Sequence, residues 1–197
     1  MSKKEEFIEI FTNKIHREGA TEFLKWLEKT DFFEAPASTK YHGCIEGGLC
    51  EHSLNVYKLF REEVLARAQK LSGVTELDDT EEEKVAICAL LHDVCKVQFY
   101  KRAFKNQKND APGAWEIVPY YTVVNKFFYG HGEKSVWLIQ RFMKLNVEES
   151  IAIRWHMGGF DEAVKGGSFD LSGAWNAYPL AMLLHVADLK ATYLLDS

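Results

Sequence analysis

The sequence has no apolar run that approaches the roughly 20 residues a helix needs to span a bilayer. The opening residues, Met-Ser-Lys-Lys-Glu-Glu, are not followed by a long apolar segment, so no secretory signal is visible. The chain also has no internal repeat and no low-complexity segment. We therefore expect a cytoplasmic protein with no membrane association.

Cysteine is scarce and lacks the paired spacing of a cysteine-based zinc site. The four cysteines stand at Cys44, Cys50, Cys88 and Cys95. Reduced, mostly buried thiols are typical of cytoplasmic proteins, and this is how we interpret them.

An excess of positive charge is also lacking, because the formal net charge is −5. The protein as a whole is therefore not a polyanion binder, although a local basic patch stays possible. With 197 residues, 47% of them hydrophobic and 27% charged, the composition is that of a soluble globule. This length corresponds to about one to one and a half typical domains, and we expect a single domain over residues 1–197.

The apolar periodicity is overwhelmingly helical and predicts an all-α fold. Thr80 with Glu83 forms a capping-box signal, and Asn146 with Glu149 forms a second N-terminal cap. Gly- and Pro-containing loops are predicted at 31–47 and 158–177. The predicted helices lie at about 3–17, 21–30, 48–71, 80–95, 131–145, 147–157 and 178–195.

Residues 97–129 interrupt the helical pattern with interleaved aromatic and basic residues. Asp110–Gly113 reads as a turn, so we predict a small β-hairpin inserted between helices. Its aromatic and basic side chains suit either of two roles. They could stack on bases and bind phosphates, or the aromatic side chains could cover the core while the lysines aid solubility. In either case the insertion should border the mouth of a site formed by the residues on its two sides.

The adjacent pair His92-Asp93 lies in the apolar segment Ala-Leu-Leu-His-Asp-Val-Cys-Lys. Imidazole and carboxylate are favoured ligands of transition metals. Further candidates are His52, His131, His156 and Asp188, each on or beside a different predicted helix. A helical bundle can bring such side chains together at one buried point.

In this order the residues resemble the HD-domain metal-dependent phosphohydrolases, whose signature is H…HD…H…H…D. The resemblance covers residues 42–192 and makes 1–40 an N-terminal helical extension. It implies that a first metal is held by His52, His92, Asp93 and Asp188. Asp93 would bridge to a second metal, which would be held by His131 and His156. Two metals at roughly 3.5–4 Å suit phosphate chemistry with a metal-activated water as nucleophile. The imidazole-rich set favours Mn²⁺, Fe²⁺, Ni²⁺, Co²⁺ or Zn²⁺ over Mg²⁺ alone.

Lys96 follows His92 by one helical turn and is the expected phosphate-binding cation, with Asp93 the other catalytic residue. Arg154 and Lys134 are weaker candidates for binding substrate. His42 fits either a substrate contact or loop packing. For His185, three residues before Asp188, we favour a supporting or core role.

The sequence thus predicts an HD phosphohydrolase acting on nucleotides or other small phosphate esters. One alternative is a phosphodiesterase or 3′→5′ nuclease acting on single-stranded ends, although the chain lacks the additional OB domain of exoribonuclease-type relatives. A second is a nucleotide-sensing module without turnover. After His156 the chain reads Met-Gly-Gly-Phe, so it lacks the Gly-Tyr-Pro motif of cyclic-dinucleotide phosphodiesterases.

Overall fold

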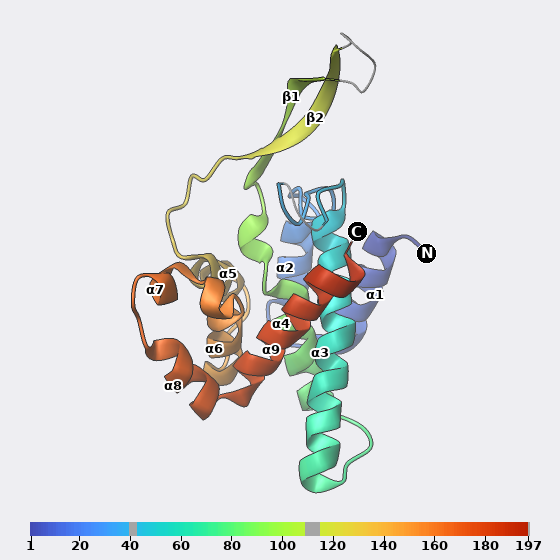
Figure 1. The fold of residues 1–197 in the computed structure, drawn as a ribbon. Coiled ribbons are helices and arrows are strands. Elements are labelled where there is room, and N and C mark those ends of the chain that lie inside the picture. The colour runs from blue at the N-terminus through green and yellow to red at the C-terminus, as the bar shows by residue number, and fades with distance from the viewer. Residues whose placement is uncertain (40–42, 109–114, 197) are drawn as a thin grey trace.

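A central helix, α3 (Gly48–Ser72), packs against α4 (Asp79–Leu91) and α9 (Pro179–Lys190) in the computed structural model (Figure 1). Helix α9 also packs against α6 (Val147–Trp155), and α6 against α5 (His131–Gln140). The structure describes residues 1–39, 43–108 and 115–196. The all-α prediction with one small hairpin is confirmed. The remaining helical elements are α1 (Lys3–Lys14), α2 (Ala20–Leu27), η1 (Val94–Lys96), η2 (Gly158–Phe160), α7 (Glu162–Lys165), α8 (Asp170–Ala177) and η3 (Ala191–Leu195).

Helices α1 and α2 place aromatic side chains on the core and are tied to the bundle by Arg17. Phe7 and Phe23 are fully buried. Arg17 stands in the segment that connects the two helices. Its guanidinium contacts Glu149 of α6 at 2.6 Å and Glu83 of α4 at 3.1 Å. One side chain near the N-terminus therefore joins the starts of two helices that follow much later in the chain.

The predicted cap of α4 is wrong by two residues. Asp78 is the N-cap, and its carboxylate accepts a hydrogen bond from the backbone N–H of Glu81. Aspartate caps as well as threonine does, so the capping-box spacing of Thr80 misplaced the start. The cap at Asn146 is confirmed, because its side chain accepts from the N–H of Glu149 while Glu149 accepts from the N–H of Asn146.

The predicted loop at 158–177 is also wrong, because it contains α7 and α8. Asp161 starts α7 by accepting a hydrogen bond from the N–H of Ala163. Leu171 and Ala174 of α8 pack with Trp155 in a small second apolar cluster. These helices are too short for their apolar spacing to stand out among the glycines.

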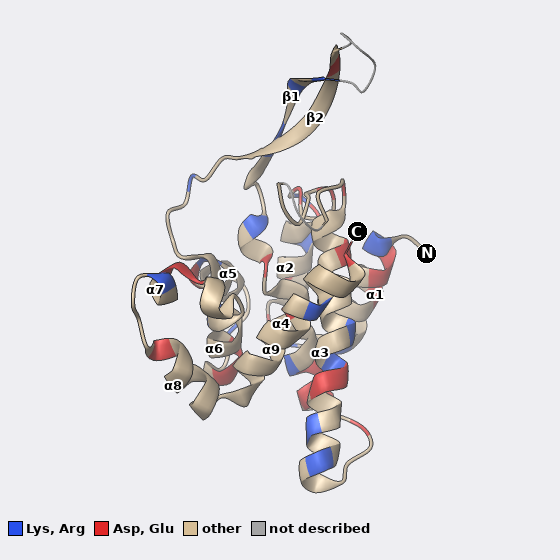
Figure 2. Ribbon diagram, in the orientation of Figure 1, with Lys and Arg blue, Asp and Glu red and all other residues tan. Residues whose placement is uncertain are grey.

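The hairpin consists of β1 (Tyr100–Lys108) and β2 (Trp115–Val123), paired antiparallel from Tyr100↔Val123 to Lys108↔Trp115. The predicted turn at Asp110–Gly113 lies outside the described residues. The hairpin stands away from the helices, and Figure 2 shows basic positions along β1 and an acidic one on β2. At its base Gln98 has a positive φ of 53° and donates its N–H to the carboxylate of Asp31.

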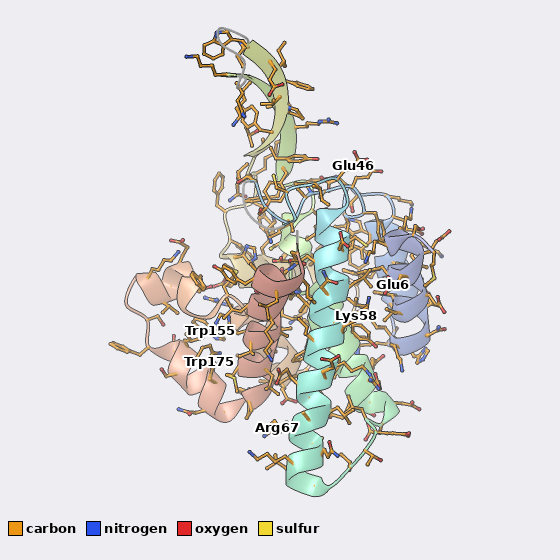
Figure 3. The ribbon with its side chains drawn as sticks, turned by 45° about the vertical axis from the view of Figure 1, so that its right-hand side comes forward. Glu6, Glu46, Lys58, Arg67, Trp155 and Trp175 are labelled. Atoms are coloured by element: carbon orange, nitrogen blue, oxygen red, sulfur yellow. The ribbon has the colours of Figure 1, made fainter. Side chains whose placement is uncertain are left out.

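The main apolar core runs from the N-terminal helices to α9 and includes Phe60, Leu90 and Leu184. The side chains in Figure 3 place Trp155 and Trp175 together beside α9. Trp155 is buried in the smaller cluster, and Trp175 packs against both clusters. The cysteines are free thiols, three of them buried, as the sequence predicted. Among the described residues, no helix is both long and apolar enough to cross a membrane.

Candidate metal centre

His92 and Asp93 stand where α4 ends. His92 is the C-cap of the helix, and Asp93 leaves the helical conformation with φ −105° and ψ 15° before η1 begins. Both residues are buried. The Nδ1 of His92 lies 2.8 Å from the carbonyl oxygen of Ala89. Because a carbonyl only accepts, Nδ1 is the donor, and Nε2 presents its lone pair away from the helix.

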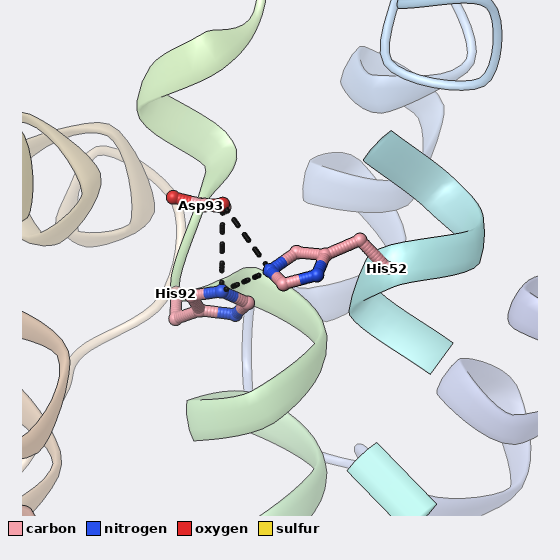
Figure 4. A group of neighbouring side chains, drawn as sticks. All are labelled: His52, His92 and Asp93. Carbon is pink, nitrogen blue, oxygen red and sulfur yellow. Dashed lines mark hydrogen bonds and ion pairs between the residues drawn. The ribbon is translucent and has the colours of Figure 1, made fainter. Parts of the chain in front are cut away.

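His52 approaches this pair from the first turns of α3 (Figure 4). Its Nε2 lies 3.2 Å from Nε2 of His92 and 3.6 Å from Oδ2 of Asp93. Its Nδ1 lies 2.7 Å from a carboxylate oxygen of Asp196, so Nδ1 is the donor here as well. The Nε2 atoms of His52 and His92 therefore face one another, while both Nδ1 atoms act as donors elsewhere.

The spacing of these atoms fits two ligands of a single ion. Nitrogens bound at about 2.0–2.1 Å from one metal are roughly 2.9–3.4 Å apart at angles between 90° and 109°. The Nε2 atoms of His52 and His92 fall in this range, and so does Oδ1 of Asp188, which lies 3.2 Å from Nε2 of His52. Asp188 reaches the cluster from the last turn of α9.

His131 and His156 face the other oxygen of Asp93. Nε2 of His131, the first residue of α5, is 2.7 Å from Oδ1 of Asp93, and Nε2 of His156 is 3.5 Å from the same atom. Helix α5 can come this close to α6 because Gly132 has no Cβ; one there would lie 2.2 Å from the carbonyl oxygen of Arg154.

His156 supplies the observation that tests whether the site fits a metal. Its Nδ1 contacts the carbonyl oxygen of Ile153 at 2.6 Å, which fixes the lone pair on Nε2. That Nε2 is buried and has no hydrogen-bond partner among the described residues. A buried nitrogen lone pair aimed at a carboxylate fits a metal ligand.

Lys96 lies beside the centre and makes an ion pair with it. Its Nζ is 2.6 Å from Oδ2 of Asp93, and its side chain is 12% exposed. Burial alone would raise the pKa of Asp93, but the charge of Lys96, the neighbouring His92 and the hydrogen bond from His131 hold it well below its usual range. Asp93 is therefore a carboxylate at any physiological pH.

The remaining ionisable groups of the centre shift in the directions that their neighbours dictate. Burial lowers the pKa of His52, but Asp188 and Asp196 outweigh it and raise the pKa to about 9. Burial likewise raises the pKa of Asp188, yet His52 holds it well below its usual range. Burial is the dominant effect at His131 and lowers its pKa. At neutral pH His52 therefore holds a proton that a bound cation would replace.

Comparison with protein-family models gives a match to the HD domain over residues 49–192, most of the chain. The chain belongs to the HD-domain family. The family is one of metal-dependent phosphohydrolases, and the match together with the His/Asp cluster indicates divalent-metal binding. No curated protein and no solved structure gave a significant match.

The structure of this HD domain brings together all six residues predicted as ligands. Their donor atoms form three groups, and within each group the atoms lie within 4.8 Å of one another. The first group is His52, His92 and Asp93; the second is His92, His156 and Asp188; the third is Asp93, His131 and His156. His92, Asp93 and His156 each belong to two of these groups.

The weaker candidates lie outside the cluster. Arg154 is paired with Glu133 at 2.6 Å and with Asp161 at 2.8 Å, and it lines a separate pocket. Lys134 lies over the ring of Phe99, and burial lowers its pKa. His42 lies outside the described residues.

His185 supports the position of His156, since its Nδ1 lies 2.6 Å from the carbonyl oxygen of that residue. Its ring stacks on Trp175 and lies against the backbone of Gly158, where a Cβ would come within 2.5 Å of it. Gly158, at a φ of 53°, allows this close approach.

Two residues near the centre were missed. Asp196 contacts His52 through one oxygen and accepts from the amide of Asn55 through the other, at 2.9 Å. The sulfur of Cys95 lies 3.4 Å from Nε2 of His131, and burial raises the pKa of this thiol to about 12. Asp196 stands outside the matched segment, and no local spacing relates it to His52.

A pocket of about 910 Å³ opens onto the centre. Its lining includes Asp93, Lys96 and Asp188 of the centre and the aromatic side chains of Phe160 and Tyr193. This volume is within the range of small-molecule and cofactor sites.

Proposed function

We propose that this HD domain is a dinuclear metal-dependent phosphohydrolase acting on nucleotides or other small phosphorylated metabolites. The observation that carries the proposal is the orientation of Asp93. One of its oxygens faces His52 and His92, at 3.6 and 3.5 Å, and the other faces His131 and His156, at 2.7 and 3.5 Å. A carboxylate between two pairs of histidines suits a bridge between two ions.

Two divalent ions held there would supply Lewis acidity and a water activated for attack at phosphorus. His52, His92 and Asp188 would hold one ion, and His131 and His156 the other, with Asp93 shared. Each of His92 and His156 donates Nδ1–H to a carbonyl in its own helix, which fixes the ring before a ligand arrives.

Lys96 is the cation suited to the transferred phosphoryl group. Its Nζ pairs with Oδ2 of Asp93 and compensates the charge of this buried carboxylate. With metal ions compensating Asp93, the ammonium group of Lys96 would be available to bind a phosphate oxygen in the pocket and stabilise the charge that develops there. The aromatic side chains of Phe160 and Tyr193, which also line the pocket, suit contact with the organic part of the substrate.

The experiment is a phosphate-release screen. Protein stripped of metal is reloaded separately with Mn²⁺, Fe²⁺, Co²⁺, Ni²⁺, Zn²⁺ or Mg²⁺ and incubated with mononucleotides and phosphorylated metabolites. We expect turnover with at least one transition metal and none with His92→Ala. A protein that binds nucleotides tightly yet releases no phosphate under any loading would instead be a sensor.

A further inference from the structure

The hairpin presents large apolar side chains to solvent instead of to the bundle. Phe104, Trp115 and Ile117 are 64%, 66% and 71% exposed. In Figure 1 the two strands extend away from the helices, and no helix in the described parts of the chain covers either face. Two-stranded hairpins bury little of their own surface, so exposed aromatic rings here need a reason outside the fold.

The strand register gathers these rings on one face. Residues directly opposite each other share a face, and neighbours along a strand alternate. The pairs Phe104↔Pro119, Asn106↔Ile117 and Lys108↔Trp115 therefore lie on the same side. We call this the aromatic face of the hairpin; it comprises Arg102, Phe104, Asn106, Lys108, Trp115, Ile117, Pro119 and Tyr121.

The charge of the hairpin is opposite in sign to that of the chain. Strand β1 carries four cations, Lys101, Arg102, Lys105 and Lys108. The two strands together carry one acidic residue, Glu116 of β2. In the described parts of the chain these cations make no ion pair. Cations of the bundle such as Lys58 and Lys84 are paired with glutamates. Unpaired positive charge on a chain of net charge −5 favours an anionic partner.

Of the four cations, Arg102 and Lys108 share the aromatic face with its rings, whereas Lys101 and Lys105 lie on the opposite face. Rings and cations together narrow the choice of anionic partner. Arg102 lies over the ring of Phe104 at 5.9 Å, so guanidinium and ring already stand together. Unpaired bases stack on such rings while the backbone phosphates meet the cations. The bases of a duplex are already stacked on one another, and so they offer exposed rings little surface.

The base of the hairpin fixes this face relative to the metal centre. Besides the bond from Gln98 to Asp31, the N–H of Val124 donates to the carbonyl of Phe99, and the hydroxyl of Tyr100 donates to the carbonyl of Ala37. Strand β1 begins four residues after Lys96. Nine residues at about 3.3 Å each make a surface roughly 30 Å long, which has room for several nucleotides.

From these observations we infer that the aromatic face of the hairpin binds single-stranded nucleic acid. The inference deepens the proposed function, because it makes a phosphate ester of a nucleic-acid strand a substrate of the same centre. Binding of the strand to the hairpin itself requires no metal ion.

The test is fluorescence anisotropy with a labelled single-stranded oligonucleotide of mixed sequence, as DNA and as RNA, and with the matching duplex, in EDTA. Single strands should bind more tightly than the duplex. Trp115→Ala should weaken binding by roughly 5- to 100-fold, the usual loss of one stacking platform. Tyr120→Ala, on the opposite face, is the matched control and should change binding little. Lys108→Gln should make the affinity less dependent on salt.

Three results would overturn the inference: no binding of the single strand, equal losses for Trp115→Ala and Tyr120→Ala, or a preference for the duplex. Anionic vesicles and sedimentation of the protein alone are measured in parallel. Capture by vesicles, or self-association that Trp115→Ala abolishes, without oligonucleotide binding would assign the face to another partner. His92→Ala should bind the oligonucleotide like the wild type. Binding without hydrolysis of any phosphate ester, including the diesters of the oligonucleotide, would therefore count against the proposed function and leave this inference intact.

Discussion

The carboxylate of Asp196 lies 2.7 Å from Nδ1 of His52, with its side chain 2% exposed. Asn55, one turn after His52 on α3, donates to the second carboxylate oxygen. A carboxylate in this position holds the imidazole in one tautomer and makes its other nitrogen a stronger ligand. His92 and His156 rely on backbone carbonyls for the same purpose, so Asp196 gives His52 a different electronic setting.

Asp196→Ala is therefore expected to weaken metal binding by roughly 10–100-fold while the fold is retained. Titration calorimetry with Mn²⁺ or Zn²⁺ measures the affinity, and circular dichroism checks the fold. Asp170→Ala, at an exposed acid of α8, is the control and should bind metal like the wild type. Equal affinities for wild type and Asp196→Ala would remove Asp196 from the metal site.

Elemental analysis of the metal-loaded protein should approach two ions per chain. His131→Ala and His156→Ala each remove a ligand from one side of Asp93, so about one ion should remain. His52→Ala should affect the opposite side and leave the ion near His131. A reproducible value near one for the wild type would reduce the centre to a single ion.

Lys96→Ala should lower turnover on the best substrate by roughly 10²–10³-fold, as expected for loss of one charge-stabilising group. The ion pair with Asp93 adds a second expectation. Without metal the variant leaves a buried carboxylate with less compensation, so its melting temperature should fall. Saturating metal should restore most of that loss. Full activity of Lys96→Ala would mean that another cation holds the phosphate.

Glu82 gives a pH dependence that is separate from the centre. It contacts Arg61 at 2.8 Å and Lys14 at 3.6 Å. Burial would raise its pKa, but these cations lower it below the ordinary value of 4.5. Because the folded state has the lower pKa, this stabilisation is present above about pH 4.5 and is lost as the pH falls through the folded value.

Glu82→Gln should therefore lower the free energy of unfolding by about 1–2 kcal/mol at pH 7, and by less at pH 4. Urea unfolding in EDTA at the two pH values measures the difference. Glu62→Gln removes an exposed carboxylate from the helix that carries Arg61 and serves as the control. A difference between wild type and Glu82→Gln that stays constant with pH would contradict the assignment.

The order and type of the ligands could be predicted from sequence because each stands in a distinct local setting. His92 and Asp93 are adjacent, and His156 lies two residues before the pair Gly158-Gly159, just after α6 ends. The hairpin could be predicted because its alternating aromatic and basic residues match no helical period. The main helices followed from their apolar spacing, with ends misplaced by a few residues.

Other features depend on tertiary contacts that leave no local pattern. The contact of Asp196 with His52 joins residues 144 positions apart, and it exists only because η3 follows α9 along α3. The ion pairs of Arg154 depend on how α5 and η2 pack around α6. Arg154 therefore faces a separate pocket, although it is close in sequence to the predicted ligand His156. Helices α7 and α8 gain their stability from contacts with Trp155 and its neighbours, which spacing alone does not reveal.

The Arg17 contacts have a consequence at a distance. Glu83 and Glu149 lie near the starts of α4 and α6, and the same two helices end at His92 and His156, whose rings are 4.8 Å apart. Helix α4, with 13 residues, is about 20 Å long. Arg17 thus ties together the starts of two helices whose opposite ends carry two of the proposed ligands, His92 and His156. We expect a substitution at Arg17 to alter the separation of these two rings, although the altered residue makes no contact with either.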